Sequence, residues 1–291
     1  MNPPTNIIDG RAIAEQIHVE TQGRIAALNT RGIQPGLAFV RVGEDPASQV
    51  YVGMKERMCA RLGIRSITHV LPAATLETEL RQLIDQLNAS SACHGILVQA
   101  PLPRHLNQAA VYASVAPEKD VDGFHPVNVG KLMLGDSDGF LPCTPAGVHQ
   151  LLIRSGVRIE GAEVVILGRG NIVGKPMAAI LLQKAKHANA TVTLCHSLTP
   201  DIPVHTRRAD ILVAALGSAR YVTAENDQAG RGDRRRGREP DSRSHREGRF
   251  PTGGRCGLRR RATPGGAHHS QSWRRGPDDH RHAHGQHRPG R

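Results

Sequence analysis

The segment from residue 163 to residue 197 constrains the fold most strongly, because it reads as a strand, a glycine-rich turn, an amphipathic helix and a second strand. An apolar strand, Val164–Leu167, leads into the turn Gly168–Gly174, and a helix leaves it. This order is typical of a βαβ unit, in which free backbone N–H groups and the helix dipole meet at one place suited to a pyrophosphate. Such turns also occur without a ligand, so the turn alone leaves both interpretations open.

The residues around this turn favour NADP over NAD as the dinucleotide. The second strand ends in Cys195, His196 and Ser197, whereas an NAD enzyme usually places an acidic residue there for the ribose hydroxyls. Arg169 lies within the turn, so a 2′-phosphate could meet both a guanidinium and a hydroxyl group. The alternative is that Arg169 only faces solvent.

The chain before this unit also alternates between strand and helix patterns, which predicts a mostly parallel sheet covered by helices. The patterns predict strands at 37–42, 66–71 and 95–99, and helices at 11–27, 46–62, 76–87 and 108–114. A further helix is expected to begin with Thr144 as its N-cap and Pro145 in its first position. The fold class is therefore α/β, with an N-terminal catalytic domain, residues 1–142, and a Rossmann-like nucleotide-binding domain, residues 143–225.

The tail formed by residues 226–291 has a composition unlike that of the rest of the chain. It holds 17 Arg, no Lys and 7 acidic residues, whereas residues 1–225 hold 21 basic and 19 acidic residues. Its large apolar side chains are only Phe250, Leu258 and Trp273, too few to offset the entropy cost of ordering the segment. We therefore predict a disordered tail. Its positive charge would also attract nucleic acid, which gives an alternative function.

Cysteine usage and hydropathy favour a cytoplasmic protein. Cys59, Cys93, Cys143 and Cys195 are widely spaced and form no C-x-x-C pair, which suits a reducing compartment and argues against a zinc site. No apolar run approaches the roughly 18 residues of a membrane span, and the N-terminus has no signal-peptide core. We expect no metal, no membrane association and no specific nucleic-acid partner.

A second chemical signal lies in a predicted helix of the N-terminal half. Tyr51 and Lys55 are four residues apart and share one face, with Ser48 about one turn earlier. A lysine beside an aromatic hydroxyl in a partly dry cleft can exchange protons near neutral pH, but the same pair also occurs on solvated helices. A short-chain dehydrogenase uses Tyr-x-x-x-Lys as well. There the glycine turn precedes the pair, whereas here Gly168 follows it.

Six motifs stand in order along residues 7–225: EDPASQVYVGMK, GILVQAPLP, PEKDVDGFHPVNVGKL, PCTPAGV, GRGNIVGKP and TVTLCHS. Together they resemble the bifunctional methylenetetrahydrofolate dehydrogenase/cyclohydrolase family, with one departure at Ala100, where the family usually has Leu. The resemblance implies oxidation of 5,10-methylenetetrahydrofolate with NADP and hydrolysis of the methenyl form to 10-formyltetrahydrofolate. It also implies a homodimer and a place in one-carbon metabolism and purine biosynthesis.

The resemblance assigns roles to residues of the folate site. It makes Lys55 the catalytic lysine, supported by Ser48, Tyr51 the ring that stacks on the folate, Gln99 the amide that tunes the lysine, and Asp122 the carboxylate that binds the pterin. A pterin edge offers an amidine-like pair of donors, which a carboxylate accepts in bidentate fashion. Asp122 could instead be a turn residue, and Gln99 a buried amide satisfied by the backbone.

The cofactor residues that the resemblance implies are Gly168, Arg169, Gly170, Ser197 and His196. His125 and Cys143 are interpreted as structural.

The family's C-terminal part is not recognisable after residue 225, and a shifted reading frame explains the tail. Codons for Trp273–His282 can be chosen that encode GGVGPMTIAM when read one base later, a motif expected of the family. Residues 226–241 likewise permit MIKPGAVIVDVGVNRI in the same frame. We therefore interpret the tail as an out-of-frame translation. This predicts an unpaired strand edge in the nucleotide domain and impaired dehydrogenase activity, with an inactive product as the alternative.

Overall fold

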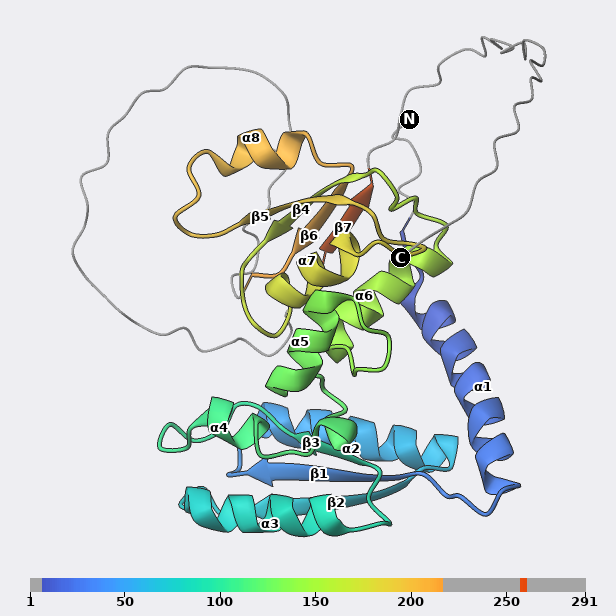
Figure 1. The fold of residues 1–291 in the computed structure, drawn as a ribbon, viewed down its shortest axis with the longest axis vertical. Coiled ribbons are helices and arrows are strands. Elements are labelled where there is room, and N and C mark those ends of the chain that lie inside the picture. The colour runs from blue at the N-terminus through green and yellow to red at the C-terminus, as the bar shows by residue number, and fades with distance from the viewer. Residues whose placement is uncertain (1–6, 217–256, 261–291) are drawn as a thin grey trace, which may run out of the picture. The chain divides into compact units, whose positions relative to one another are not determined.

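The computed structural model describes residues 7–216 and 257–260, and for the last four residues it describes the backbone alone. Two sheets, the first parallel and the second mostly parallel, each with covering helices, succeed one another along the chain (Figure 1). The predicted α/β class, with two successive domains, is therefore confirmed.

The first domain is built on a three-stranded sheet in the order β2-β1-β3, with every strand parallel to its neighbour. Its strands are β1 (Gly36–Val42), β2 (Arg65–Leu71) and β3 (Gly95–Val98). Its helices are α1 (Gly10–Asn29), α2 (Pro46–Leu62), α3 (Glu77–Ala89), α4 (Gln108–Tyr112) and the 3-10 turn Pro117–Lys119. The predicted elements are all present, with bounds that differ by at most two residues.

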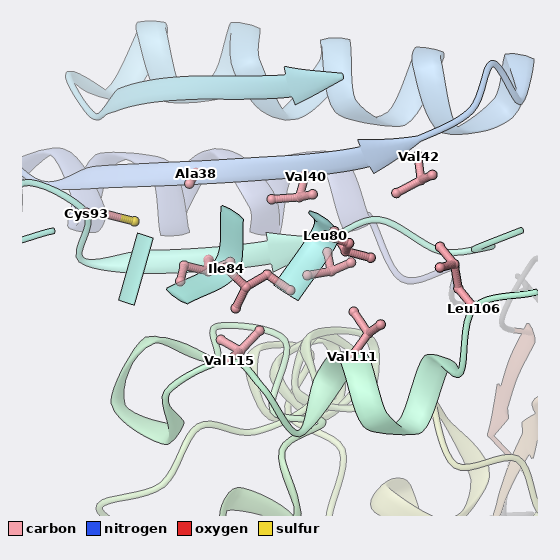
Figure 2. Close-up of a cluster of buried hydrophobic side chains, with 11 residues drawn as sticks. Ala38, Val40, Val42, Leu80, Ile84, Cys93, Leu106, Val111 and Val115 are labelled. Carbon is pink, nitrogen blue, oxygen red and sulfur yellow. The ribbon is translucent and has the colours of Figure 1, made fainter. Parts of the chain in front are cut away.

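The central strand β1 is buried on both faces, so alternate side chains enter two different cores. Ala38, Val40 and Val42 join the cluster that contains Leu80 of α3, as Figure 2 shows. Phe39 points to the other face, where it packs with Val52 and Cys59 of α2. This double burial is typical of a parallel sheet covered by helices on both sides, and it fixes α2 against the sheet.

The second domain has a four-stranded sheet in the order β5-β4-β6-β7. Its elements are α6 (Cys143–Arg154), β4 (Glu163–Leu167), α7 (Gly174–Leu182), β5 (Thr191–Cys195), α8 (Ile202–Arg207), β6 (Ile211–Ala214) and β7 (Gly257–Arg260). Helix α5 (Pro126–Leu134) precedes the expected boundary at residue 143, and its Leu132 packs with Ala179 and Ile180 of α7. The predicted cap at Thr144 is wrong. Helix α6 begins at Cys143, because Pro142 is the last residue with a non-helical backbone and so occupies the N-cap position.

Strand β7 comes from the basic tail and pairs antiparallel with β6, from Ile211 opposite Arg260 to Ala214 opposite Gly257. The edge of β6 that we predicted to be unpaired is therefore paired at these four residues. The physical reason is that an open strand edge offers backbone donors and acceptors to any extended segment, whatever its side chains. The rest of the prediction for the tail lies outside the described residues.

Candidate active site

Helix α2 carries three of the predicted site residues, and its start is fixed by two local features. The Asp45 carboxylate accepts a hydrogen bond from the Ser48 backbone N–H at 2.8 Å, and Pro46 occupies the first turn. Ser48 itself is buried, whereas Tyr51 is 45% exposed. The exposed ring is available to a flat ligand. Among the described residues, no hydrogen bond joins Tyr51 to Lys55.

Gln99 follows the carboxyl end of β3 and holds the lysine. Its backbone N–H continues the sheet by donating to the Val40 carbonyl at 2.8 Å, while its side-chain oxygen accepts from Lys55 Nζ at 3.1 Å. Its side-chain amide donates to the Ala100 carbonyl at 2.7 Å. The amide is therefore oriented with its oxygen toward the lysine.

Ser48 makes no direct hydrogen bond to Lys55 within the described residues. Its hydroxyl donates to the Ala100 carbonyl at 3.3 Å, the same oxygen that accepts from Gln99. It therefore joins α2 to the segment after β3.

The two aspartates of the DVDG motif do different work. Asp120 is buried, and its Oδ2 accepts from the His125 backbone N–H at 2.7 Å and from Asn128 Nδ2 at 2.9 Å. A Cβ on the next glycine, Gly123 (φ 67°), would lie 2.7 Å from the Leu141 carbonyl carbon, so only glycine fits there. Asp120 and Gly123 thus fix the loop that carries Asp122.

Asp122 lies among groups that act on its charge. Burial raises the pKa of its carboxyl, and the Asp120 charge raises it further. The Lys55 charge and a hydrogen bond with Cys143 lower this pKa and so offset part of the effect. Burial also raises the pKa of the Cys143 thiol to about 11, together with the Asp122 charge, although part of that side chain remains exposed. Cys143 is therefore a neutral donor beside Asp122, a contact that our structural interpretation of this residue missed. His125 caps α5 through Nδ1, in agreement with its structural interpretation.

The raised pKa of Asp122 predicts a gain in stability for Asp122→Asn. Because the folded state holds this proton more tightly than the unfolded chain does, the stabilising contribution is complete at low pH and is lost as pH rises through the folded-state pKa. The ionised group therefore destabilises the fold at neutral pH, and Asn removes that cost, by about 1 kcal/mol. Thermal unfolding without ligand should show a higher Tm for Asp122→Asn at neutral pH, and a smaller difference in acid. A lower Tm at neutral pH would refute this account.

The glycine turn of the second domain contains glycines of two kinds. A Cβ on Gly168 would lie 2.2 Å from the Ala215 carbonyl oxygen, and a Cβ on Gly174 would lie 1.9 Å from the Gly168 carbonyl oxygen. These two allow the turn to close against β6 and α7. A Cβ on Gly170, by contrast, would meet no described atom within 4 Å. Internal packing therefore does not require glycine at this position, which fits a place where the backbone approaches a ligand.

The other predicted cofactor residues follow strands that are neighbours in the sheet. Leu167 pairs with Cys195, so Arg169 and Ser197 each stand two residues beyond a matched pair. Both are exposed, and Arg169 has no hydrogen bond or ion pair to any residue within 7–216. His196 contributes to its own turn, because its Nδ1 accepts from the Leu198 backbone N–H at 3.2 Å. The structure thus brings Arg169 and Ser197 to one edge, and it gives His196 a local role.

The two kinds of glycine predict opposite results for the same substitution. Gly170→Ala should leave Tm nearly unchanged, since a surface change of this kind is usually within about 0.5 kcal/mol, but it should weaken NADP binding at least roughly tenfold. Gly174→Ala should lower the stability of the domain by more than about 2 kcal/mol, because backbone must move. Calorimetric titration with NADP and thermal unfolding measure both effects. If Gly170→Ala binds NADP as the wild type does, the turn is not the dinucleotide site.

Other candidate sites are few in the described part of the chain. No group of three His, Cys, Asp or Glu side chains could hold a metal ion among residues 7–216 and 257–260. A small cavity of about 60 Å³ lies near the start of β1, beside Gly36 and Cys93, and none of the predicted site residues lines it. In the same described residues no helix is long and apolar enough to cross a membrane.

The fold and the site define a two-domain enzyme with a dinucleotide turn in the second domain and a lysine–amide–carboxylate cluster in the first. Comparison with known proteins agrees with this class. The tetrahydrofolate dehydrogenase/cyclohydrolase family matches through its catalytic domain at residues 8–122 and through its NAD(P)-binding domain at residues 142–231. The chain belongs to this family.

Individual relatives are similar over most of their length. The bifunctional protein FolD of Dehalococcoides mccartyi (strain CBDB1) is 55% identical over 221 residues, 76% of this chain and 74% of the relative. A crystal structure of the bifunctional enzyme FolD from Campylobacter jejuni is 43% identical, with a TM-score of 0.73 over 77% of this chain and 78% of that one. FolD of Trypanosoma brucei, solved with NADP and an inhibitor, is 40% identical, with a TM-score of 0.73 over 78% and 77%.

Proposed function

We propose that this chain oxidises 5,10-methylenetetrahydrofolate to the methenyl form with NADP and hydrolyses that form to 10-formyltetrahydrofolate. The observation that carries the proposal is the cluster of Lys55, Gln99 and Asp122 at the carboxyl end of the first sheet. Gln99 holds the lysine at 3.1 Å, and the lysine charge acts on Asp122. Ligands of open α/β sheets bind at this end of the strands.

In this proposal the first domain binds the substrate at one edge and at one face of its bicyclic ring system. The ionised Asp122 carboxylate accepts two hydrogen bonds from the amidine-like edge of the pterin, and the exposed Tyr51 ring stacks on the flat part of the folate. Lys55 is then left beside the one-carbon bridge. An ordered lysine at this place orients the carbon for both reactions.

Hydrolysis depends on proton transfer by this chain's own residues. Water adds to the methenyl carbon, one carbon–nitrogen bond of the bridge breaks, and one proton leaves as the formyl group forms. Lys55 is the group that relays this proton, and the oxygen of Gln99 keeps its Nζ directed toward the reacting atoms. Tuning by Gln99 and positioning by Ser48 are parts of the same proposal.

The second domain is proposed to hold NADP, which supplies the hydride acceptor for the oxidation. The open space at Gly170 fits a pyrophosphate against the backbone, and the exposed Arg169 guanidinium with the Ser197 hydroxyl fits a 2′-phosphate. A role for His196 is retained only through its ring Nε2, since Nδ1 is engaged.

We also propose that the tail results from a shifted reading frame. The match to the family's NAD(P)-binding domain stops at residue 231, which supports an unrelated sequence beyond that point. A nucleic-acid-binding function through the tail is not favoured, because the family match accounts for both described domains. A cytoplasmic homodimer, with a place in one-carbon metabolism and purine biosynthesis, completes the proposal.

The direct experiment supplies the purified full chain with 5,10-methenyltetrahydrofolate, and separately with the methylene form plus NADP. The proposal expects enzyme-dependent 10-formyltetrahydrofolate from the first mixture, well above the rate in buffer. It expects NADPH from the second, at a rate that the altered tail reduces. Absence of both products at high enzyme concentration, in a sample that unfolds cooperatively, would refute the proposed function.

A further inference from the structure

One buried hydroxyl near the site lacks the partner that such groups normally have. Tyr112 is the last residue of α4, and its Oη has no hydrogen-bond partner among residues 7–216 and 257–260, although solvent does not reach it. The great majority of buried polar atoms in proteins are hydrogen-bonded, and an unpaired one destabilises the fold. Phenylalanine at this position would avoid this cost. The hydroxyl therefore fits a hydrogen bond that forms only when a ligand binds or the loop moves.

The ring of Tyr112 is well fixed, so the place of its hydroxyl is defined. The ring packs against the apolar cluster of the first domain that includes Val111 and Leu80. It also contacts the Phe124 ring, with 5.1 Å between the ring centroids and 32° between their planes. Phe124 follows Asp122 by two residues, which ties the tyrosine to the loop that carries the carboxylate.

Two carboxylates act on this hydroxyl. Burial raises the pKa of Tyr112, and the charges of Asp122 and Asp120 raise it further, so the hydroxyl stays neutral and remains a donor. Asp120 already accepts from His125 and Asn128. Within the part of the chain that the structure describes, Asp122 has only the Cys143 thiol as a donor, and the single proton of that thiol is shared with the Val121 carbonyl oxygen, which lies 3.3 Å from Sγ. Asp122 therefore has free lone pairs and is the more suitable acceptor for the Tyr112 hydroxyl.

We propose that Tyr112 is a positioning residue for folate binding, whose hydroxyl donates a hydrogen bond to the Asp122 carboxylate when the pterin occupies the site. The inference rests on the proposed role of Asp122 in reading the pterin edge. A carboxylate has about four lone-pair directions, of which the pterin uses two. In a site from which the bound ring excludes water, the Tyr112 hydroxyl occupies a third direction and holds the charged carboxylate in place.

The test is Tyr112→Phe, which removes only the hydroxyl. Calorimetric titration of the full chain with 5-formyltetrahydrofolate should show affinity lowered roughly tenfold, the usual effect of losing a hydrogen bond to a charged group. The kcat for methenyl hydrolysis should change by less than about twofold, because the hydroxyl does not touch the reacting carbon. The Tm without ligand should stay the same or rise, since an unpaired polar group is removed.

A double-mutant cycle with Asp122→Asn separates the possible failures. If Tyr112 acts through Asp122, the double variant binds the folate no more weakly than Asp122→Asn alone. Unchanged affinity in Tyr112→Phe, a lowered Tm with unchanged affinity, or additive losses in the double variant would overturn the inference while leaving the proposed function intact. Unchanged affinity in Asp122→Asn would overturn the proposed role of Asp122, and the inference with it.

Discussion

Lys55→Met is expected to abolish most of the hydrolysis of 5,10-methenyltetrahydrofolate, with a loss in kcat of roughly 10²–10⁴-fold, the usual contribution of a positioned acid–base group. Methionine keeps the length and flexibility of the stem but has no proton to relay. Lys55 is half-buried and bonded to Gln99 alone among the described residues, so its removal leaves the packing of α2 against Phe39 and Leu97 intact. The Tm should therefore fall by only a few degrees.

A matched control distinguishes loss of this lysine from loss of positive charge in general. Lys186 is exposed and lies outside both proposed sites, so Lys186→Met should keep the wild-type rate of hydrolysis. The rate is followed by chromatography of 10-formyltetrahydrofolate, with the spontaneous reaction subtracted. Should Lys55→Met retain more than about a tenth of the wild-type kcat, Lys55 would not be the proton-transfer group.

Restoring the reading frame after residue 225 is expected to raise NADP-dependent oxidation of 5,10-methylenetetrahydrofolate by about 100-fold or more. The restored segment would supply the glycine-containing motif that the family resemblance leads us to expect beside the nicotinamide, and orientation of the nicotinamide is worth several kcal/mol in the reaction. It would also replace the segment that forms the antiparallel strand β7. Hydrolysis, which uses the first domain, should differ by no more than a few-fold between the two forms.

Two observations check this prediction independently. Side-by-side assays of both purified forms give the ratio of the dehydrogenase rates, with the hydrolysis rate as the internal control for folded enzyme. Sequencing the DNA across the codons for Ala224–Asp227 tests whether a base has been gained or lost there. Equal dehydrogenase rates in the two forms would show that the tail does not impair the second domain.

Much of the fold follows from the sequence because parallel strands buried on both faces leave a strong local signal. The run Val164–Leu167 is entirely buried, and so is Gly95–Val98, and both were recognisable as short apolar runs bounded by turn residues. Strand β7 could not be foreseen, because its pairing with β6 is made by backbone groups and leaves no apolar pattern in Gly257–Arg260.

The site was predictable only in part, for a reason that the DVDG motif illustrates. The family resemblance pointed to Asp122, whereas residue type and spacing alone do not separate it from Asp120, whose role depends on burial and on the approach of Asn128 from the next helix. The contact of Cys143 with Asp122 and the unpaired hydroxyl of Tyr112 likewise arise from tertiary packing. Such contacts leave no periodic pattern, so motif spacing alone could not reveal them.

The central claim is that one face of α2, the segment after β3 and the loop that carries Asp122 form the folate site. A crystal structure of the full chain with 5-formyltetrahydrofolate tests it most directly. The account predicts the pterin edge within hydrogen-bond distance of the Asp122 carboxylate, the Tyr51 ring against the folate, and Lys55 Nζ beside the formyl group. A folate bound away from Lys55 and Asp122 would contradict it.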